Sequence, residues 1–219
     1  MKRTIVGIFA HPDDEAFGPG GSLALYARNN NVYLICVTDG ESEERYKTSE
    51  HSVLKDIRDK ELLLSAKVLG VKEVFFMGYK DGALCNNLYH EIADSIQQKL
   101  DMLKPDTIIT FEPRGISGHI DHIAVAMIAT FLWERLSYIK KIMYYCISKA
   151  QRAMQGDYFI HFPPGYEEAE VDEVLDVSSE WEKKLEAINK HVSQKADVET
   201  FIRQISNIPK KELFLVKEK

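Results

Sequence analysis

The sequence predicts an α/β protein in which helices cover both faces of a Rossmann-like, mostly parallel sheet, with a small C-terminal β/α extension. Short apolar runs alternate with longer amphipathic runs over the first two-thirds of the chain. The short runs are apolar throughout, as strands are when both faces of the sheet are covered. The amphipathic runs are long enough to be the crossover helices that parallel strands need.

The core elements follow from this alternation. Five apolar runs predict strands, at residues 4–10, 32–38, 73–78, 106–111 and 141–147. Four amphipathic runs predict helices, at residues 22–29, 52–70, 88–103 and 119–137. In the second helix the apolar residues are Val53, Ile57, Leu64, Val68 and Leu69, and Gly70 is a stop signal.

The pattern changes after Ala150. Three further strands are expected, at residues 158–162, 171–177 and 212–217. Ser179 and Glu182 have the spacing of a capping box, for a helix that continues to about Ile205.

The whole chain is expected to be a single domain. No linker, repeat or low-complexity stretch interrupts the sequence. Residues 1–150 would form the α/β core, and residues 151–219 would supply strands and a helix that complete the same domain. Residues 163–170 read as a loop rather than a boundary, and the polar residues 40–51 as a mobile loop near the first motif.

Composition excludes several classes of protein. A net charge of -6 argues against a nucleic-acid binder that relies on phosphate contacts. Three widely spaced cysteines form neither a disulfide framework nor a zinc motif, and Cys36 and Cys146 are expected to be buried thiols. The first apolar run, residues 5–10, is too short for a signal peptide, and no run is long enough to span a membrane. We therefore expect a cytoplasmic protein.

Two clusters of histidine and acidic residues follow strands of the predicted sheet. HPDDE occupies residues 11–15, directly after the first strand, and GHIDH occupies residues 118–122, after the fourth. Asp39 and Asp81 also follow strands. In open α/β sheets ligands bind beyond the carboxyl ends of the strands, so the clusters are expected to share one polar pocket.

Histidine and carboxylate together suit a divalent metal. A catalytic zinc ion keeps three protein ligands, which can be imidazole nitrogens and carboxylate oxygens, and a water. His11, one of Asp13 and Asp14, and one histidine of the second cluster would supply those ligands. A dication would also favour the ionised forms of adjacent acids that otherwise repel one another. The residues alone do not choose between the two aspartates.

The remaining groups suit proton transfer. The aspartate that does not bind the metal is placed to act as a general base. The second histidine of GHIDH is a candidate to stabilise an oxyanion or to act as a general acid, and Asp121 is a candidate to hydrogen-bond an imidazole. Either cluster alone is equally consistent with an ordinary helix start, in which Asp13 or Asp121 favours the first turn. Their joint occurrence at strand ends of one sheet favours a site. The GPGGS turn at residues 18–22 lacks the glycine spacing and the lysine of phosphate-binding loops, and is expected to seat the following helix.

These motifs resemble the PIG-L/LmbE family of zinc-dependent N-acetylglucosamine deacetylases. AHPDDE after the first strand and GHIDH after a later strand are the most specific features. Three further segments of this chain are similar to segments of the family: RDKELLLSAKVLGV (58–71), FFMGYKDGAL (75–84) and KLEAINKHVSQ (184–194). The resemblance spans about residues 10–195.

The resemblance implies a role for each residue of the motifs. It implies that zinc is bound by His11, Asp14 and His122. It implies that Asp13 is the general base, which takes a proton from the attacking water, and that His119 stabilises the oxyanion or protonates the amine. Substrate contacts are implied for Arg58 and Asp81. Asp121, as the expected hydrogen-bond partner of an imidazole, is counted with the catalytic residues. The implied reaction is hydrolysis of the N-acetyl group of an amino-sugar conjugate, giving acetate and a free amine.

Two departures from the family pattern stand in the second motif. Ile120 occupies a position where proline is frequent in the family, which should leave the ligands intact. Ser117 stands where one relative has a tyrosine, so assistance from a tyrosine is not expected here. The chain shows no membrane anchor, so the glycosylphosphatidylinositol precursor is not the expected substrate.

Several polar residues keep two interpretations. His51 and His90 lie in polar stretches and are expected at the surface. His161 is either structural or part of the pocket. His191 either hydrogen-bonds near the site or packs between helices. Glu15 either orients a ligand or favours the helix start.

Two rival functions are also compatible with the sequence. A metal-dependent phosphohydrolase also places acids at strand ends, but two histidines and the missing phosphate cradle favour zinc over magnesium. A non-catalytic sugar-binding relative would not need the complete set of ligands and base. The expected partner is a small amino-sugar substrate, with no nucleic acid and no membrane, and a homo-oligomer is compatible with the sequence.

Overall fold

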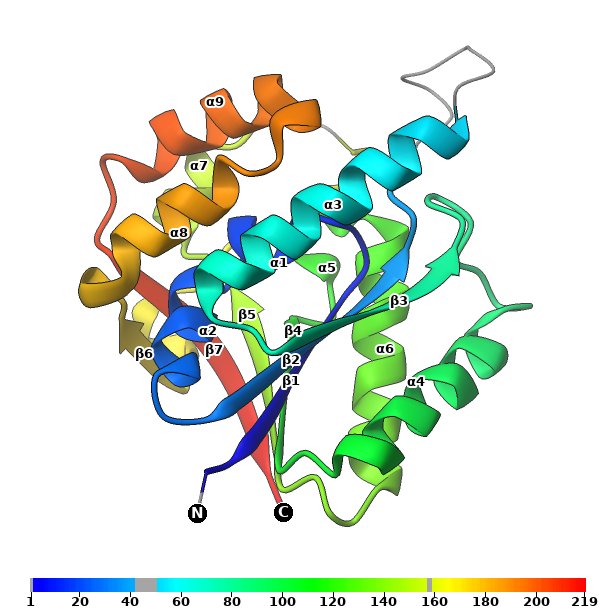
Figure 1. Ribbon diagram of the computed structural model, residues 1–219. Coiled ribbons are helices and arrows are strands. Elements are labelled where there is room, and N and C mark those ends of the chain that lie inside the picture. Colours follow the sequence, from blue (N-terminus) through cyan, green and yellow to red (C-terminus); the bar gives the residue numbers. More distant parts are fainter. Residues whose placement is uncertain (1, 42–50, 157–158) are drawn as a thin grey trace.

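The computed structural model describes residues 2–41, 51–156 and 159–219, without the side chains of residues 51–53. These residues form a seven-stranded sheet in the order β3-β2-β1-β4-β5-β7-β6 (Figure 1). The strands are β1 (Thr4–Phe9), β2 (Asn31–Thr38), β3 (Glu73–Tyr79), β4 (Thr107–Phe111), β5 (Lys141–Cys146), β6 (Glu173–Asp176) and β7 (Lys211–Glu218). The first five run parallel, whereas β7 pairs antiparallel with both β5 and β6. The predicted mostly parallel α/β fold is confirmed.

Helices cover both faces of the sheet (Figure 1). One face carries α1 (Asp14–Phe17), α2 (Gly20–Ala27), α3 (His51–Leu69), α8 (Trp181–Ile188) and α9 (Lys195–Ile205). The other carries α4 (Tyr89–Leu103) and α6 (Ile120–Arg135). The short helices α5 (Gly115–Gly118) and α7 (Lys149–Ala153) lie beyond the carboxyl ends of β4 and β5. Strand side chains alternate between the two apolar cores, which explains why the predicted strands are apolar throughout.

The C-terminal part of the chain completes the sheet and one helical layer. Strand β7 pairs along the whole of β5, and α8 packs against α2 and α3. Lys184 of α8 and Glu212 of β7 form a fully buried ion pair, with 2.6 Å between Nζ and Oε1. The Glu212 carboxylate also accepts the N–H groups of Gly21 and Ser22, so it binds the start of α2. That the chain is one domain stays a prediction, and these contacts support it.

Three sequence-based predictions for the C-terminal part are corrected. Of the strand expected at residues 158–162, Tyr158 lies outside the described residues and residues 159–162 form no strand, because β7 already pairs with the free edge of β5. Ser179 lies in a 3₁₀ turn (Ser178–Glu180) before α8, so it does not cap the helix and the capping box is wrong. The single helix expected to about Ile205 is two helices, interrupted by a turn around His191.

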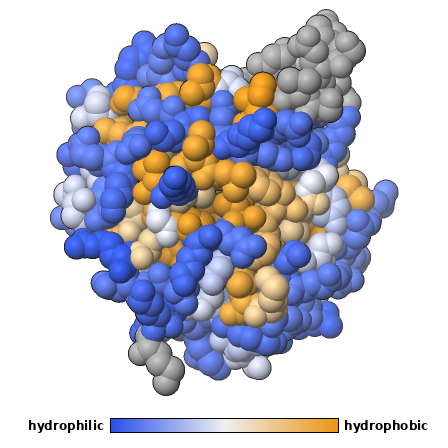
Figure 2. Space-filling model, viewed as in Figure 1, coloured by the Kyte–Doolittle hydropathy of each residue, from blue (hydrophilic) through white to orange (hydrophobic). Residues whose placement is uncertain are grey.

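Helix α3 buries polar residues and exposes apolar ones. Ile57 and Leu64 are 40% and 52% exposed, although both belong to the apolar pattern expected to face the core. Arg58, Glu61 and Ser65 are buried instead, at a spacing that places them on one face. Apolar surface is visible across the middle of this face of the molecule, over α3 and β3 (Figure 2). Arg58 and Ser65 are buried against Asp13 and Glu15 of the first motif, and Glu61 is buried against Ser193.

The remaining expectations concern single segments. Cys36 and Cys146 are buried thiols, as predicted. The expected mobile loop at residues 40–51 falls largely on residues 42–50, which lie outside the described residues. His90 is exposed, as predicted, and the side chain of His51 is not described. Within the part of the chain that the structure describes, no helix is long and apolar enough to cross a bilayer.

Candidate active site

The two histidine–acid clusters meet at one edge of the sheet. HPDDE leaves the carboxyl end of β1, and GHIDH leads from the end of β4 into α6. Strands β1 and β4 are parallel neighbours, so their carboxyl ends lie side by side. The two motifs are about a hundred residues apart in sequence, and yet His11 contacts His122 and Asp121. The two clusters therefore meet, as the strand-end argument predicts.

The rings of His11 and His122 direct one nitrogen each at the same point. His11 Nδ1 and His122 Nε2 are 3.0 Å apart. The second nitrogen of each ring has its own acceptor. His122 Nδ1–H donates to the carbonyl of Gly115 at 3.1 Å, and His11 Nε2–H donates to Asp81 at 3.0 Å. The two facing nitrogens therefore have to share one positive centre between them, either a proton or a metal ion.

Asp14 completes this group from the first turn of α1. Its Oδ1 lies 3.3 Å from His122 Nε2, and its Oδ2 lies 3.6 Å from His11 Nδ1. Oδ2 also accepts the backbone N–H of His11 at 2.8 Å, which fixes the carboxylate. Burial by itself raises the pKa of Asp14, but the neighbouring His122 and His11 hold it well below its usual range.

The group of His11, Asp14 and His122 fits a divalent metal. Two imidazole nitrogens and one carboxylate oxygen are the donor set of many catalytic zinc sites. Without a metal, burial by itself lowers the pKa of His11, and the carboxylates of Asp121, Asp14 and Asp81 more than offset this and raise it well above its usual range. A proton on Nδ1 then occupies the position that a dication would take.

Asp13 stands beside this group but points to a different partner. Its Oδ2 accepts a hydrogen bond from Arg58 Nη2 at 2.8 Å. Its backbone has φ 136° and ψ -27°, a region that side chains rarely adopt and that costs on the order of 1–3 kcal/mol. Burial raises the pKa of Asp13 to about 6, although Arg58 opposes this. The Asp13 carboxyl thus has a pKa near neutrality and is held by Arg58, apart from the group of His11, Asp14 and His122, named the metal group.

His119 is the N-cap of α6, and this contact fixes its tautomer. Its Nδ1 accepts the backbone N–H of Asp121 at 3.1 Å, so the neutral ring carries its proton on Nε2. Burial, together with the charges of His11 and His122, lowers the pKa of His119 to about 4. Phe159 packs edge-on against the ring, with 4.9 Å between centroids. His119 is therefore a neutral hydrogen-bond donor through Nε2.

Asp121 and Asp81 hold the far side of His11. Asp121 Oδ2 lies 3.3 Å from His11 Nε2, and the side chain is fully buried. The N–H groups of Gly82 and Leu84 donate to its two oxygens at 2.7 and 3.2 Å. Burial by itself raises the pKa of Asp81, but its hydrogen bond with His11 lowers it. Both acids therefore orient an imidazole, which was predicted for Asp121 but not for Asp81.

Arg58 is committed to the protein rather than open to a substrate. It is 6% exposed, and its guanidinium donates to the carbonyls of Pro12 and Gly40 as well as to Asp13. A Cβ at Gly40 would lie 2.6 Å from Arg58 Nη1, so this close contact requires glycine. These contacts assign Arg58 to holding Asp13, and the substrate contact implied for it stays a prediction.

The sequence left the roles of Glu15 and His191 open, and it did not point to Ser65 and Glu112, which also support the site. Glu15 accepts hydrogen bonds from Ser65 Oγ and His191 Nε2, at 2.5 and 2.9 Å. Glu112 accepts the N–H groups of Arg114 and Ile116 and holds the loop before His119. The buried polar face of α3 could have been found from the spacing of its polar residues. Nothing in the local sequence marks the partner of Glu15, which lies 176 positions away.

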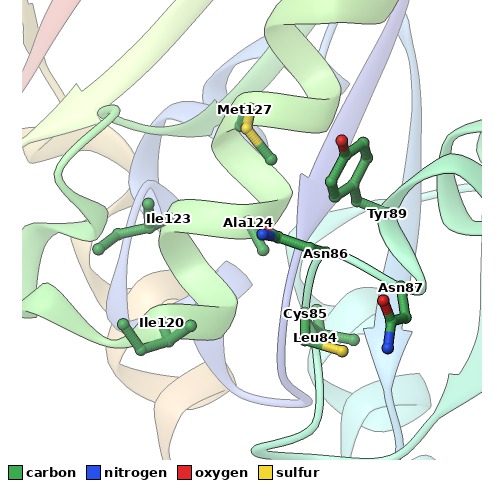
Figure 3. A pocket seen from close by; sticks show the side chains of 9 residues that line it. All are labelled: Leu84, Cys85, Asn86, Asn87, Tyr89, Ile120, Ile123, Ala124 and Met127. Atoms are coloured by element: carbon green, nitrogen blue, oxygen red, sulfur yellow. The ribbon is translucent and has the colours of Figure 1, made fainter.

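A pocket of about 510 Å³ adjoins the site on the outer side of α6 (Figure 3). It lies between α6 and the segment that leads into α4, and the side chain of Asn86 points from that segment toward α6. The lining is mostly apolar and includes Leu84, Cys85, Tyr89, Ile120, Ile123 and Met127. Ile120 directly follows His119, and Leu84 binds Asp121 through its N–H. The pocket is thus attached to the segments that form the site.

Comparison with known proteins agrees with this geometry. The sequence profile of the PIG-L family, described as GlcNAc-PI de-N-acetylase, matches residues 6–132, more than half of the chain. The chain belongs to the PIG-L family. A probable N-acetyl-alpha-D-glucosaminyl L-malate deacetylase 2 from Bacillus anthracis is 29% identical over 209 residues, which cover 93% of this chain and 86% of that protein.

Solved structures confirm the fold of this PIG-L family member. The N,N'-diacetylchitobiose deacetylase of Pyrococcus horikoshii is similar, with a TM-score of 0.75 and 23% identity over 99% of this chain and 84% of that one. GalB, a 4-carboxy-2-hydroxymuconate hydratase from Pseudomonas putida, is also similar, with a TM-score of 0.69 and 18% identity over 100% and 97% of the chains. The same fold thus supports different reactions, and the reaction has to be argued from the site.

Proposed function

We propose that this protein is a zinc-dependent hydrolase that removes the N-acetyl group from an N-acetylglucosaminyl conjugate, giving acetate and a free amine. The observation that carries the proposal is a division of roles between neighbouring acids. Asp14 belongs to a group of metal donors with His11 and His122, whereas Asp13 lies beside that group and is held by Arg58. A hydrolase needs both a Lewis acid and a separate base for the attacking water.

Zinc is the proposed metal because of the donor set. Imidazole nitrogens suit zinc, whereas magnesium prefers oxygen ligands and keeps several waters. Bound there, the ion would supply a Lewis acid that polarises the amide carbonyl. The same donor set argues against a phosphohydrolase, and the GPGGS turn is the start of α2 and is bound by Glu212.

The chain's own residues account for the proton transfers. Asp13 accepts the proton of the attacking water, since burial raises its pKa towards neutrality. His119 donates a hydrogen bond from Nε2 to the oxygen that becomes negative. A pKa of about 4 leaves His119 without a spare proton at neutral pH. Asp13 is therefore the group that returns a proton to the leaving nitrogen.

The substrate class comes from the relatives. The similar protein from Bacillus anthracis is described as a probable N-acetyl-alpha-D-glucosaminyl L-malate deacetylase, and that from Pyrococcus horikoshii as an N,N'-diacetylchitobiose deacetylase. We infer that this chain acts on an amino-sugar conjugate, with the substituent of the sugar directed to the apolar pocket beside α6. A catalytic role also follows from the presence of Asp13, which sugar binding alone would not need. The cytoplasm remains a sequence-based prediction.

A homo-oligomer stays a proposal. The exposed apolar residues of α3, which are Ile57, Leu63 and Leu64, are where a second copy would pack. Light scattering on the purified protein would give the number of subunits. A Leu63→Glu and Leu64→Glu double variant would then be monomeric if these residues form the contact, and unchanged in mass if they do not.

The test is acetate release across N-acetylglucosaminyl conjugates that differ in the substituent. We expect release from at least one conjugate, loss after chelation, and recovery on addition of zinc. N-acetylated amino acids serve as controls and should release no acetate. A zinc-loaded, folded protein that releases acetate from no conjugate in the series would overturn the proposed function.

A further inference from the structure

We propose that Glu15 and His191 form a buried positioning pair, which holds the base Asp13 in its unusual backbone conformation. The inference rests on the proposed function for the role of Asp13 and on the geometry for the rest. Neither residue touches the metal group or a substrate. His191 comes from the turn between α8 and α9, at the opposite end of the sequence from Asp13.

The backbone of Asp13 needs external support. A positive φ of 136° at a residue with a side chain persists only where surrounding contacts hold it. Two of these contacts come from Arg58, to the Pro12 carbonyl at 2.6 Å and to the Asp13 carboxylate at 2.8 Å. The N–H of Asp13 donates to Glu15 Oε2 at 3.1 Å, and its carbonyl accepts the N–H groups of Ala16 and Phe17 at 2.9 and 3.0 Å. Arg58 thus fixes one side of the residue and Glu15 the other.

Both oxygens of the Glu15 carboxylate accept hydrogen bonds from protein groups. Oε2 accepts Asp13 N–H, while Oε1 accepts Ser65 Oγ at 2.5 Å and His191 Nε2 at 2.9 Å. The side chain is 1% exposed. All of these donors are protein groups, so the function of the carboxylate is to hold its neighbours. Glu15 therefore orients Asp13, and does more than favour the start of α1.

His191 is the residue that sets the position of Glu15. Its ring is completely buried. Nε2 donates a hydrogen bond to Glu15, whereas Nδ1 has no hydrogen-bond partner among the described residues. The ring also packs against Phe17 of α1, with centroids 6.3 Å apart. Helix α8 ends at Ile188, and the chain then bends so that the His191 side chain is directed inward. The break in the predicted long helix thus delivers this side chain to the motif.

Each of the three adjacent acids has its own cationic or metal-binding partner. Asp13 has Arg58, Asp14 lies with the histidines of the metal group, and Glu15 has His191. Loss of His191 leaves Glu15 buried with Ser65 and the Asp13 N–H as its remaining donors. The carboxylate is then free to turn away, and the Asp13 backbone can relax to an ordinary conformation. The base would move while the metal donors stay in place.

The matched control lies two residues from His191. Ser193 donates two hydrogen bonds to Glu61 of α3, at 2.7 and 2.6 Å, and it does not contact Glu15. Ser193→Ala removes one bond of the same turn and should lower stability with kcat unchanged. His191→Gln retains an N–H donor near the position of Nε2, and His191→Leu removes it with similar volume.

The experiment compares these variants as zinc-loaded proteins. We expect His191→Leu to lower kcat by about 10–100-fold, with KM and zinc content close to wild type. His191→Gln should recover most of that loss. Hydrogen exchange of a peptide that spans residues 11–18 should speed up in His191→Leu and stay slow in Ser193→Ala. Glu15→Gln, which places an N–H against other donors, should give the same result as His191→Leu.

The outcomes separate this inference from the proposed function. Should no variant, including wild type, release acetate, the proposed function fails, and the exchange of the 11–18 peptide still decides whether His191 holds Asp13. Equal exchange and equal kcat in wild type and His191→Leu overturn the positioning pair. A loss of kcat of equal size in Ser193→Ala and His191→Leu, with no recovery in His191→Gln, would also overturn it, because it would reflect general loosening of the turn.

Discussion

The Nδ1 atom of His11 and the Nε2 atom of His122 lie 3.0 Å apart, and the other nitrogen of each ring already donates to an acceptor. Two unprotonated nitrogens that face each other at this distance repel, so a positive centre has to lie with them. The carboxylate of Asp14 closes the group from a third side. The charge of the site thus depends on whether a proton or a metal ion occupies this position.

Zinc binding is expected to release a proton. The pKa of His11 is held well above its usual range, so in the metal-free protein Nδ1 is protonated at neutral pH. A metal ligand has to be deprotonated, so about one proton should leave as zinc binds, and apparent affinity should rise with pH. Calorimetry in buffers of different ionisation enthalpy measures the number released. Binding without proton release would mean that His11 is neutral beforehand.

Asp121→Asn should weaken metal binding without removing a ligand. The carboxylate orients His11 through Nε2 and is held by the N–H groups of Gly82 and Leu84. Loss of such an outer partner typically costs about 10–100-fold in metal affinity or activity. Competition with a chelator of known affinity measures the change. An unaltered zinc affinity would show that Asp81 alone orients His11.

The activity should have an acid limb set by Asp13. Burial raises its pKa to about 6, so below that pH the carboxyl is protonated and cannot accept a proton. The value of kcat/KM should fall by about tenfold for each pH unit below the limb. Bound zinc is a nearby positive charge that lowers this pKa, so the limb of the loaded enzyme should lie below about 6.

Removal of Arg58 should move that limb upwards. Arg58 opposes the effect of burial on the pKa of Asp13, so Arg58→Met should shift the acid limb to higher pH. Arg58→Lys keeps a positive charge near the carboxylate and should shift it less. A pH profile of kcat/KM for the three proteins checks the order. An identical limb in all three would assign the titration to another group.

The buried pair of Lys184 and Glu212 should contribute strongly to stability. Lys184→Met leaves the Glu212 carboxylate buried without its cation, which costs on the order of 3–5 kcal/mol. The matched control is Lys141→Met, since its partner Glu173 is partly exposed, and a loss of about 0–1 kcal/mol is expected there. Urea unfolding followed by circular dichroism gives both values. Equal losses would contradict this account of how residues 151–219 are joined to the core.

Much of the fold follows from local sequence. A strand covered on both faces is apolar at every position, so β1 and β4 are recognisable without any tertiary information. The site follows from the same fact, because parallel strands bring what comes after them to one edge. For that reason the sequence predicts that HPDDE and GHIDH lie together, and in the structure His11 contacts His122 and Asp121.

Other features depend on partners that are far apart in sequence. Residues 159–162 are rich in apolar and aromatic residues, as strands are, but the edge of β5 is already paired with β7. Ile57 and Leu64 fit an apolar pattern, yet α3 turns Arg58 and Ser65 inward because Asp13 and Glu15 need donors. Hydrogen bonds to the site thus decide which face of α3 is buried. The apolar periodicity of the sequence does not show these hydrogen bonds.

The most direct test of the account is the comparison of Asp13→Asn with Asp14→Asn, with zinc content and acetate release measured on the same samples. The geometry predicts that Asp13→Asn keeps about one zinc per chain, as in a three-ligand site, and loses acetate release. Asp14→Asn should lose both zinc and activity. Loss of zinc in Asp13→Asn and its retention in Asp14→Asn would contradict the account, because the base and the metal ligand would then be exchanged.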